Sequence, residues 1–282
     1  MTEQVTKAFT HGGKFHADDV FGAALLQYLY PKIQIERGYE VPENYDGIVF
    51  DIGFGEFDHH QENKRVRENG IAYAAFGLLW EKYGTCILGE EEAKRFDEKF
   101  IQPLDLNDNT GEYHEVASII GLFNPAWDSN ENSDDAFKQA VEFASKILNM
   151  KFQKVFSILR AKELVETAVQ KQQDGIMVME IGAPWKQFVA HTDIEFVVTP
   201  SLRGGFNAQG VEAEGEERQL KCPFPECLRG KTSEELVEIT GIPTLHFCHN
   251  SGFLAATRTV EDAVAVCKFA KRMQAKQQET NE

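Results

Sequence analysis

The sequence contains few cysteines and no long apolar segment. Its five cysteines among 282 residues are odd in number and scattered, so they provide no disulfide framework. No apolar run approaches the ~18 residues of a membrane span, and the first ten residues lack the basic start and apolar stretch of a signal peptide. No glycine-rich segment has the spacing of a Walker A or dinucleotide-binding loop. These absences predict a cytoplasmic protein that uses neither a nucleoside triphosphate nor NAD.

Basic residues are also scarce, and their shortage is uneven. The chain has 45 acidic and 29 basic side chains, a net charge of −16, of which residues 1–150 carry −14. Such an acidic half repels a phosphate backbone, which disfavours extended duplex binding driven by counterion release. Clustered carboxylates instead suit hard divalent cations.

Short predicted strands alternate with helices in the first part of the chain, which favours a parallel α/β sheet. We expect strands at 5–9, 32–36 and 48–50, and helices at 20–30, 71–83, 90–100, 134–149 and 151–171. From residue 176 the pattern changes to short β-rich segments, at 176–181, 188–191, 196–199, 245–248 and 253–256. The sequence thus predicts an α/β domain over 1–150, a helical connector over 151–174 and a smaller α+β domain over 175–282.

Histidines and aspartates gather where the first predicted strands end. They are His11, His16, Asp18, Asp19, Asp51, Asp58, His59 and His60. Because the carboxyl ends of parallel strands line one crevice, these segments can converge there, and Gly12 and Gly13 let the first loop turn inward. Imidazoles and carboxylates suit Mn, Mg, Fe or Zn, and one aspartate can bridge two ions ~3.5–4 Å apart. The residues therefore predict either a two-metal site or a single iron held by His11, His16 and Asp18. A further acidic segment at 104–109 is expected to be a loop.

Five segments carry a resemblance to a known family. They are HGGKFHADDVFGAALL (11–26), FDHHQ (57–61), LDLNDN (104–109), FPECLRGKTSEEL (224–236) and HNSGF (249–253). Asp58-His59-His60, after an apolar strand ending in Asp51, resembles the DHH phosphoesterase superfamily. Together the segments are similar to the melanocyte-proliferating-gene protein family of DHH-like exonucleases, from about residue 7 to residue 257. The resemblance implies a metal-binding α/β domain followed by a substrate-binding domain, with the active site between them.

The resemblance also implies a role for each site residue. His11, His16 and Asp51 would hold one ion, and Asp18, Asp51, His59 and Asp108 would hold a second, with Asp51 bridging. His60 would face the substrate as an acid or a phosphate contact. Asp19 and Asp58 would orient the metal ligands without contacting the ions themselves. In the second domain the family normally has arginine where Asn207 stands, and Arg203 could substitute for it, with Gly204 and Gly205 letting a ligand approach the backbone. Arg229 and His249 are further candidates for substrate binding.

The resulting hypothesis is a divalent-metal-dependent phosphoester hydrolase, either a 3′–5′ exonuclease or a short-oligonucleotide phosphodiesterase. Two ions, with Mn expected ahead of Mg, Fe or Zn, would activate a hydroxide that attacks phosphorus. The substrate would be a short or single-stranded nucleic acid or a small phosphodiester. Two alternatives stay open: the mononuclear iron enzyme, and a metal-binding module without turnover. The second arises because family members normally have arginine where Asn207 stands.

Overall fold

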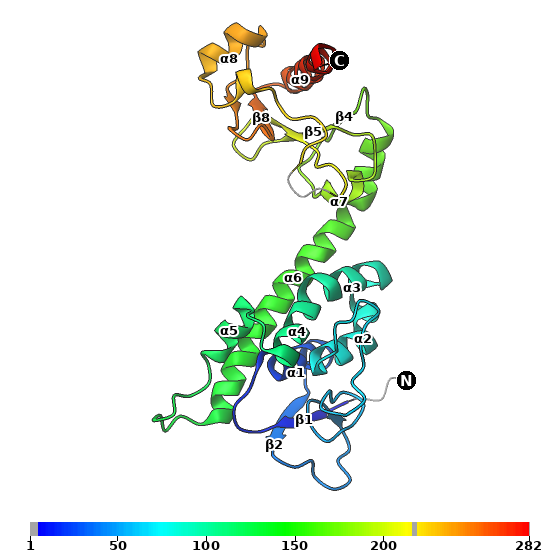
Figure 1. Cartoon of the computed structure of the whole chain (residues 1–282), viewed down its shortest axis with the longest axis vertical. Coiled ribbons are helices and arrows are strands. Elements are labelled where there is room, and N and C mark those ends of the chain that lie inside the picture. The colour runs from blue at the N-terminus through cyan, green and yellow to red at the C-terminus, as the bar shows by residue number, and fades with distance from the viewer. Residues whose placement is uncertain (1–4, 216–218, 282) are drawn as a thin grey trace. The chain divides into compact units, whose positions relative to one another are not determined.

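The chain divides into two compact units, Met1–Phe156 and Ser157–Glu282 (Figure 1). The structure, a computed structural model, describes residues 5–215 and 219–281. Each unit has its own buried core. Within the described residues, every helix is too short or too polar to cross a membrane.

The first unit is built on a three-stranded parallel sheet. Its strands are β1 (Lys7–His11), β2 (Gln34–Gly38) and β3 (Ile48–Val49), in the order β2-β1-β3. The predicted parallel α/β arrangement is therefore confirmed. Because β1 is central, the loop that follows it lies between the loops that follow β2 and β3.

The first unit also contains several helices. They are α1 (Ala17–Leu29), α2 (Ala75–Leu88), α3 (Glu90–Phe96), a π-helical turn (Asp97–Ile101), α4 (Gln102–Thr110), α5 (Glu115–Gly121) and α6 (Ser133–Gln170), the last of which also contributes to the second unit. The two helices predicted at 134–149 and 151–171 are one, because no glycine or proline interrupts α6.

The prediction of a loop at 104–109 is wrong, because this segment forms most of the helix α4. Pro103 lies in the first turn of α4, directly after the π-helical turn, and Gly111 ends the helix in the left-handed conformation at φ +75°. The acidic side chains of this segment therefore project from a rigid helix rather than from a turn.

Aromatic side chains join α1, α2 and α6 in the first core. Phe21 on α1 stacks on Phe76 of α2 at 5.6 Å between ring centroids, and Trp80 of α2 stacks on Phe152 of α6 at 5.9 Å. All four are buried, and an aromatic pair contributes about 0.5–1.5 kcal/mol beyond its buried area. This packing fixes the starts of α1 and α2 relative to each other.

The second unit has a five-stranded mixed sheet in the order β4-β5-β6-β8-β7. Its elements are β4 (Ile176–Val178), α7 (Lys186–Val189), β5 (Phe196–Pro200), β6 (Phe206–Gly210), a 3₁₀ turn (Glu226–Leu228), α8 (Ser233–Thr240), β7 (Phe247–Cys248), β8 (Leu254–Thr257) and α9 (Val260–Asn281). The strand predicted at 188–191 is wrong: α7 overlaps it, since a short apolar run has no decisive period. Strand β6 was not predicted, because its sequence, FNAQG, alternates only weakly.

Candidate metal centre

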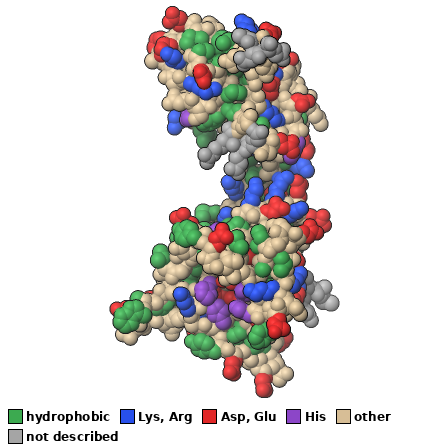
Figure 2. Space-filling model, in the orientation of Figure 1, with side chains coloured by type: hydrophobic (Ala, Val, Ile, Leu, Met, Phe, Trp, Pro, Cys, Tyr) green, Lys and Arg blue, Asp and Glu red, His purple; other side chains and the backbone are tan. Residues whose placement is uncertain are grey.

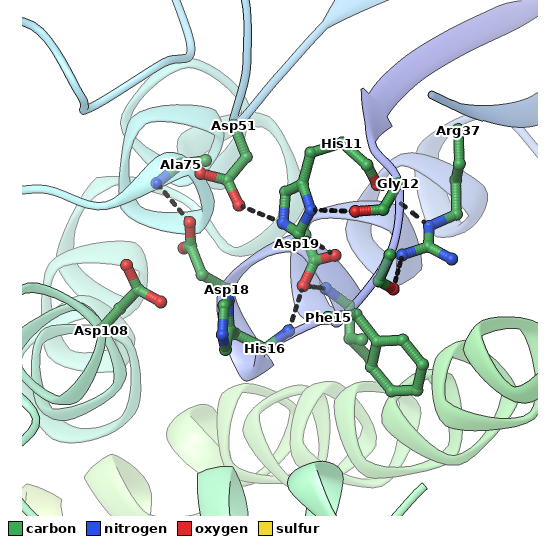
Figure 3. A network of polar contacts seen from close by, with 12 residues as sticks. His11, Gly12, Phe15, His16, Asp18, Asp19, Arg37, Asp51, Ala75 and Asp108 are labelled. Carbon is green, nitrogen blue, oxygen red and sulfur yellow. Dashed lines mark hydrogen bonds and ion pairs between the residues drawn. The ribbon is translucent and has the colours of Figure 1, made fainter. Parts of the chain in front are cut away.

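The loop after β1 carries the first histidine into the site. His11 is the last residue of β1, and Gly13 turns the chain at φ +78° toward the start of α1. Arg37 of β2 holds this loop, because its Nε donates to the carbonyl of His11 at 3.1 Å and its Nη2 to that of Gly13 at 2.9 Å (Figure 3). The backbone that presents His11 is thus fixed from the neighbouring strand.

Asp18 and Asp19 are adjacent in the first turn of α1 but have different partners. The Asp18 carboxylate accepts the N–H groups of Ala75 at 2.8 Å and Phe76 at 2.7 Å, in the first turn of α2. Asp19 Oδ1 accepts the N–H of His16 at 2.8 Å, whereas its Oδ2 is buried without a hydrogen bond, 3.4 Å from His11 Nε2. Both aspartates therefore cap helices, and since each carboxylate oxygen has two lone pairs, capping leaves acceptor capacity for a cation.

Asp51 lies between two histidines. It follows β3 in the left-handed conformation, at φ +57°, and is buried. Its Oδ2 is 3.3 Å from His11 Nε2, and its Oδ1 is 3.1 Å from His59 Nε2. Each oxygen of this carboxylate thus faces a different imidazole.

His59 is surrounded by carboxylates. Besides Asp51, its Nε2 lies 3.2 Å from Asp108 Oδ2 of α4 and 3.9 Å from Asp18 Oδ2 of α1. Its Nδ1 lies 3.4 Å from the side-chain oxygen of Asn109, so a proton placed on Nδ1 would leave the Nε2 lone pair available to a metal ion. Figure 3 shows Asp18, Asp51 and Asp108 around one space.

Three overlapping groups of donor atoms result, each within 4.8 Å. They are His11, Asp19 and Asp51; Asp51, His59 and His60; and Asp18, His59 and Asp108. Of the ligands that the resemblance implies, only His16 lies outside these groups; its ring centroid is 6.0 Å from that of His11, and it lines the adjoining cavity. Asp18 groups with His59 and Asp108 and not with His11 and His16, so this geometry gives the mononuclear triad no support.

The electrostatics of the cluster favour a bound cation. Burial and the charge of Asp51 raise the pKa values of Asp18 and Asp108, and burial raises the pKa of Asp19 to about 7. Burial would also raise the pKa of Asp51, but hydrogen bonds and charges from His11 and His59 lower it to about 2. A divalent ion would offset the repulsion between the carboxylates of Asp18, Asp51 and Asp108, and it would supply the partner that Asp19 Oδ2 lacks. Oxygen and imidazole donors of this kind fit Mn, Mg, Fe or Zn.

The cluster opens into a cavity of about 810 Å³. Figure 2 shows the histidines on one face of the first unit, with basic side chains on both sides. His60 is 57% exposed, and its Nδ1 lies 2.8 Å from Asp58 Oδ1. Among the described residues its Nε2 has no partner, so it is available to a ligand in the cavity.

Two further residues support the site and were not predicted. The Asn109 amide donates to the carbonyls of Tyr73 and Asp105, at 3.1 and 3.0 Å, and Lys64 Nζ donates to Asn109 Oδ1 at 3.1 Å. Both Asn109 and Lys64 line the cavity. The sequence signal that could have identified Asn109 as part of the site is its position directly after Asp108.

The residues predicted to bind substrate in the second unit lie at two ends of β8. Arg203 is exposed beside Gly204 and Gly205, and Gly205 is so close to the carbonyl of Thr257 that a side chain would not fit. At the other end, near Leu254, His249 Nδ1 accepts the N–H of Ser251 at 3.1 Å.

Arg229 is held within its own loop as well. Its Nε donates to the carbonyl of Phe224 at 2.9 Å, and the N–H of Gly230 donates to the carbonyl of Cys248. Arg229 and His249 thus order neighbouring loops. A role of these residues in substrate binding stays a prediction.

Fold and site together define an α/β protein with an aspartate- and histidine-rich centre able to hold metal ions. A family model named for MYG1 exonuclease and described as "Uncharacterised protein family (UPF0160)" matches residues 7–270. The chain belongs to this family, as its motifs predicted. Membership of the wider DHH superfamily stays a prediction.

Several curated proteins are similar to the chain along most of its length. A MYG1 protein of Schizosaccharomyces pombe is 26% identical over 316 residues, which cover 94% of this chain and 97% of the relative. A human protein named MYG1 exonuclease is 28% identical over 318 residues, covering 92% and 84%. A MYG1 protein of Dictyostelium discoideum is 28% identical over 309 residues, covering 90% and 93%. No solved structure matches the chain significantly.

Proposed function

We propose that the chain is a divalent-metal-dependent phosphodiester hydrolase that acts on short or single-stranded nucleic acid as a 3′–5′ exonuclease. The observation that carries the proposal is the position of Asp51, whose two oxygens face His11 and His59 at 3.3 and 3.1 Å. This is the arrangement expected of a carboxylate that bridges two ions. The human and mouse relatives named MYG1 exonuclease support the reaction class.

The residues present fit two ions, with Mn preferred. His11, Asp19 and Asp51 would hold one, which makes Asp19 a ligand in place of His16, contrary to the roles that the resemblance implied for these two residues. Asp51, His59, Asp108 and Asp18 would hold the other. Bound divalent ions acidify a coordinated water and neutralise charge that develops on a phosphate.

The side chains around the centre would position the substrate and move its proton. Lys14 and Lys64 line the cavity and would attract the phosphates of a short strand. His60, whose Nδ1 is held by Asp58, would donate a proton from Nε2 to the leaving oxygen.

The acidic first half argues against long duplex substrates. Residues 1–150 carry a net charge of −14, so few phosphates can be neutralised outside the cavity. We expect binding to depend weakly on salt. In a plot of the logarithm of the binding constant against the logarithm of the salt concentration, each phosphate contact contributes about −0.9 to the slope. A slope that corresponds to six or more contacts would contradict this substrate assignment.

Replacing Asp51 tests the proposal. Asp51→Asn should lose both ions and the hydrolysis of a short oligonucleotide while it stays folded, because a neutral amide cannot offset two divalent charges. Elemental analysis, circular dichroism and a nuclease assay with Mn measure the three properties. Asp46→Asn, which removes the same charge at an exposed position, is the control and should keep ions and activity. A folded Asp51→Asn protein with two ions would refute the bridge, and a wild-type protein that holds two ions without any turnover would refute the hydrolase.

A further inference from the structure

Phe54 is an exposed aromatic residue at the edge of the metal centre. Its side chain is 72% exposed and lines both the 810 Å³ cavity and an adjoining hollow of about 430 Å³. His60 and Lys64 line the same cavity. A phenylalanine in this position gains little from burial, so folding alone does not explain its placement.

The backbone that carries Phe54 is strained. Phe54 has φ +56°, a conformation rare for a bulky residue, and Asp51 and Gly53 in the same loop have φ +57° and +86°. Strain of this kind persists only where surrounding contacts impose it, and it is concentrated at functional sites.

Two side chains of the neighbouring motif impose this conformation. The N–H of Phe54 donates to Asp58 Oδ2 at 2.6 Å, and the Gln61 amide donates to the carbonyls of Phe54 and Gly55 at 2.9 and 2.8 Å. The other oxygen of Asp58 lies 2.8 Å from His60 Nδ1. One carboxylate therefore fixes both the backbone of Phe54 and the imidazole at the substrate side of the cavity.

We propose that Phe54 is a stacking platform for a nucleobase next to the phosphate that the metal centre binds. The proposal rests on the proposed function and specifies its substrate class further, as phosphodiesters that carry a base. An exposed phenyl face offers a base a planar apolar surface, and stacking tolerates every base because each has a π face. Lys14 and Lys64, on the same cavity, are cations for the adjacent phosphates. We therefore expect selection for a base over a bare sugar phosphate and little preference among bases.

Dinucleotides with and without bases test this platform. The substrates are thymidylyl-thymidine and two analogues, each lacking one of the two bases but keeping its sugar. Phe54→Ala should lower kcat/KM for the full dinucleotide about 5- to 150-fold, the effect of losing one stacked base. The same substitution should have no effect on the analogue that lacks the stacked base. Phe54→Tyr should keep most of the activity on the full dinucleotide, and Phe54→Leu, which is apolar without a π face, should lower kcat/KM as much as Phe54→Ala does.

A matched control removes another exposed aromatic side chain. Trp127 is 97% exposed and does not line the cavity, so Trp127→Ala should leave all three substrates unaffected. Equal losses for Phe54→Ala on all three substrates would show that Phe54 only shapes the loop and would overturn the proposal. Unchanged kinetics with the full dinucleotide would overturn it as well.

Binding separates this proposal from the proposed function. In a Phe54→Trp variant, thymidine 5′-monophosphate should quench the new indole fluorescence, whereas 2-deoxyribose 5-phosphate should not. Quenching without hydrolysis by the wild-type protein would refute the nuclease and keep the platform. Hydrolysis with equal fluorescence changes for both probes would refute the platform and keep the nuclease.

Discussion

Gly77, in the first turn of α2, lies against a buried ion pair. A Cβ atom at this position would overlap Oδ2 of Asp105 and lie 2.8 Å from Nη2 of Arg67. These two groups form an ion pair at 2.7 Å, and the Arg67 guanidinium is also held by Asp97 at 2.7 and 2.9 Å. Gly77→Ala therefore forces apart an ion pair that joins the segment before α2 to α4.

The sign of the stability change follows from two opposing effects. Alanine stabilises a helix interior by up to about 1 kcal/mol relative to glycine. Disrupting a buried ion pair costs about 3–5 kcal/mol, and Asp105 is fully buried. We expect Gly77→Ala to lower the free energy of unfolding by about 2–4 kcal/mol. It should also weaken metal binding, because the same turn of α2 supplies the N–H groups that hold Asp18.

Urea unfolding followed by the fluorescence of the buried Trp80 measures the change in the first unit. Gly121→Ala is the control, since a Cβ at that helical position meets no atom within 4 Å and should be neutral or slightly stabilising. In an Asp105→Ala background the cost of Gly77→Ala should largely disappear. A Gly77→Ala protein as stable as the wild type would refute the packing argument.

Three further predictions concern the centre and its loop. His59→Gln should lose an ion, whereas His60→Gln should keep its metal and lose about 10²- to 10⁴-fold in single-turnover rate; loss of metal from His60→Gln would reverse the two roles. Burial lowers the pKa of His11, but its hydrogen bond to Asp51 and the nearby aspartate charges raise it to about 9 in the metal-free protein. The folded state thus holds this proton more tightly, so the stability that protonated His11 contributes is complete below pH 6.5 and should be lost as the pH rises to about 9. Urea unfolding at a series of pH values, with a chelator present, measures this loss. His11→Gln should make the free energy of unfolding less dependent on pH over this range. Phe54→Gly should raise the free energy of unfolding by about 0.5–1 kcal/mol through relief of strain, while a lower melting temperature would show that the ring packs.

Local patterns in the sequence predicted much of the centre. The segment from His11 to Asp19 has a strand, a glycine turn and an acidic helix start, and each feature is encoded within a few residues. The DHH segment at 58–60 is equally local, and the parallel sheet places it beside the first. Periodicity and motif spacing are sufficient to predict candidate site residues where the residues that form the site are close in sequence.

Other parts of the centre depend on contacts between distant residues. The N–H groups that hold Asp18 come from Ala75 and Phe76, and their positions depend on aromatic packing between α1 and α2. Asp108 reaches the centre because 104–109 is part of the helix α4. The polar composition of this segment favoured a loop, so the helix could not be predicted from the local sequence. Backbone strain at Phe54 has no signature in the sequence, because phenylalanine rarely adopts a positive φ.

The two contacts of Asp58 limit how this site can diverge. One of its oxygens holds the backbone of the aromatic residue and the other holds the imidazole at the cavity. A substitution that moves the platform to admit a different ligand would also move the proton donor of the proposed reaction. Changes in ligand preference are therefore expected to arise at Phe54 itself or at the lysines of the cavity, where a side chain can be exchanged without altering the geometry of His60.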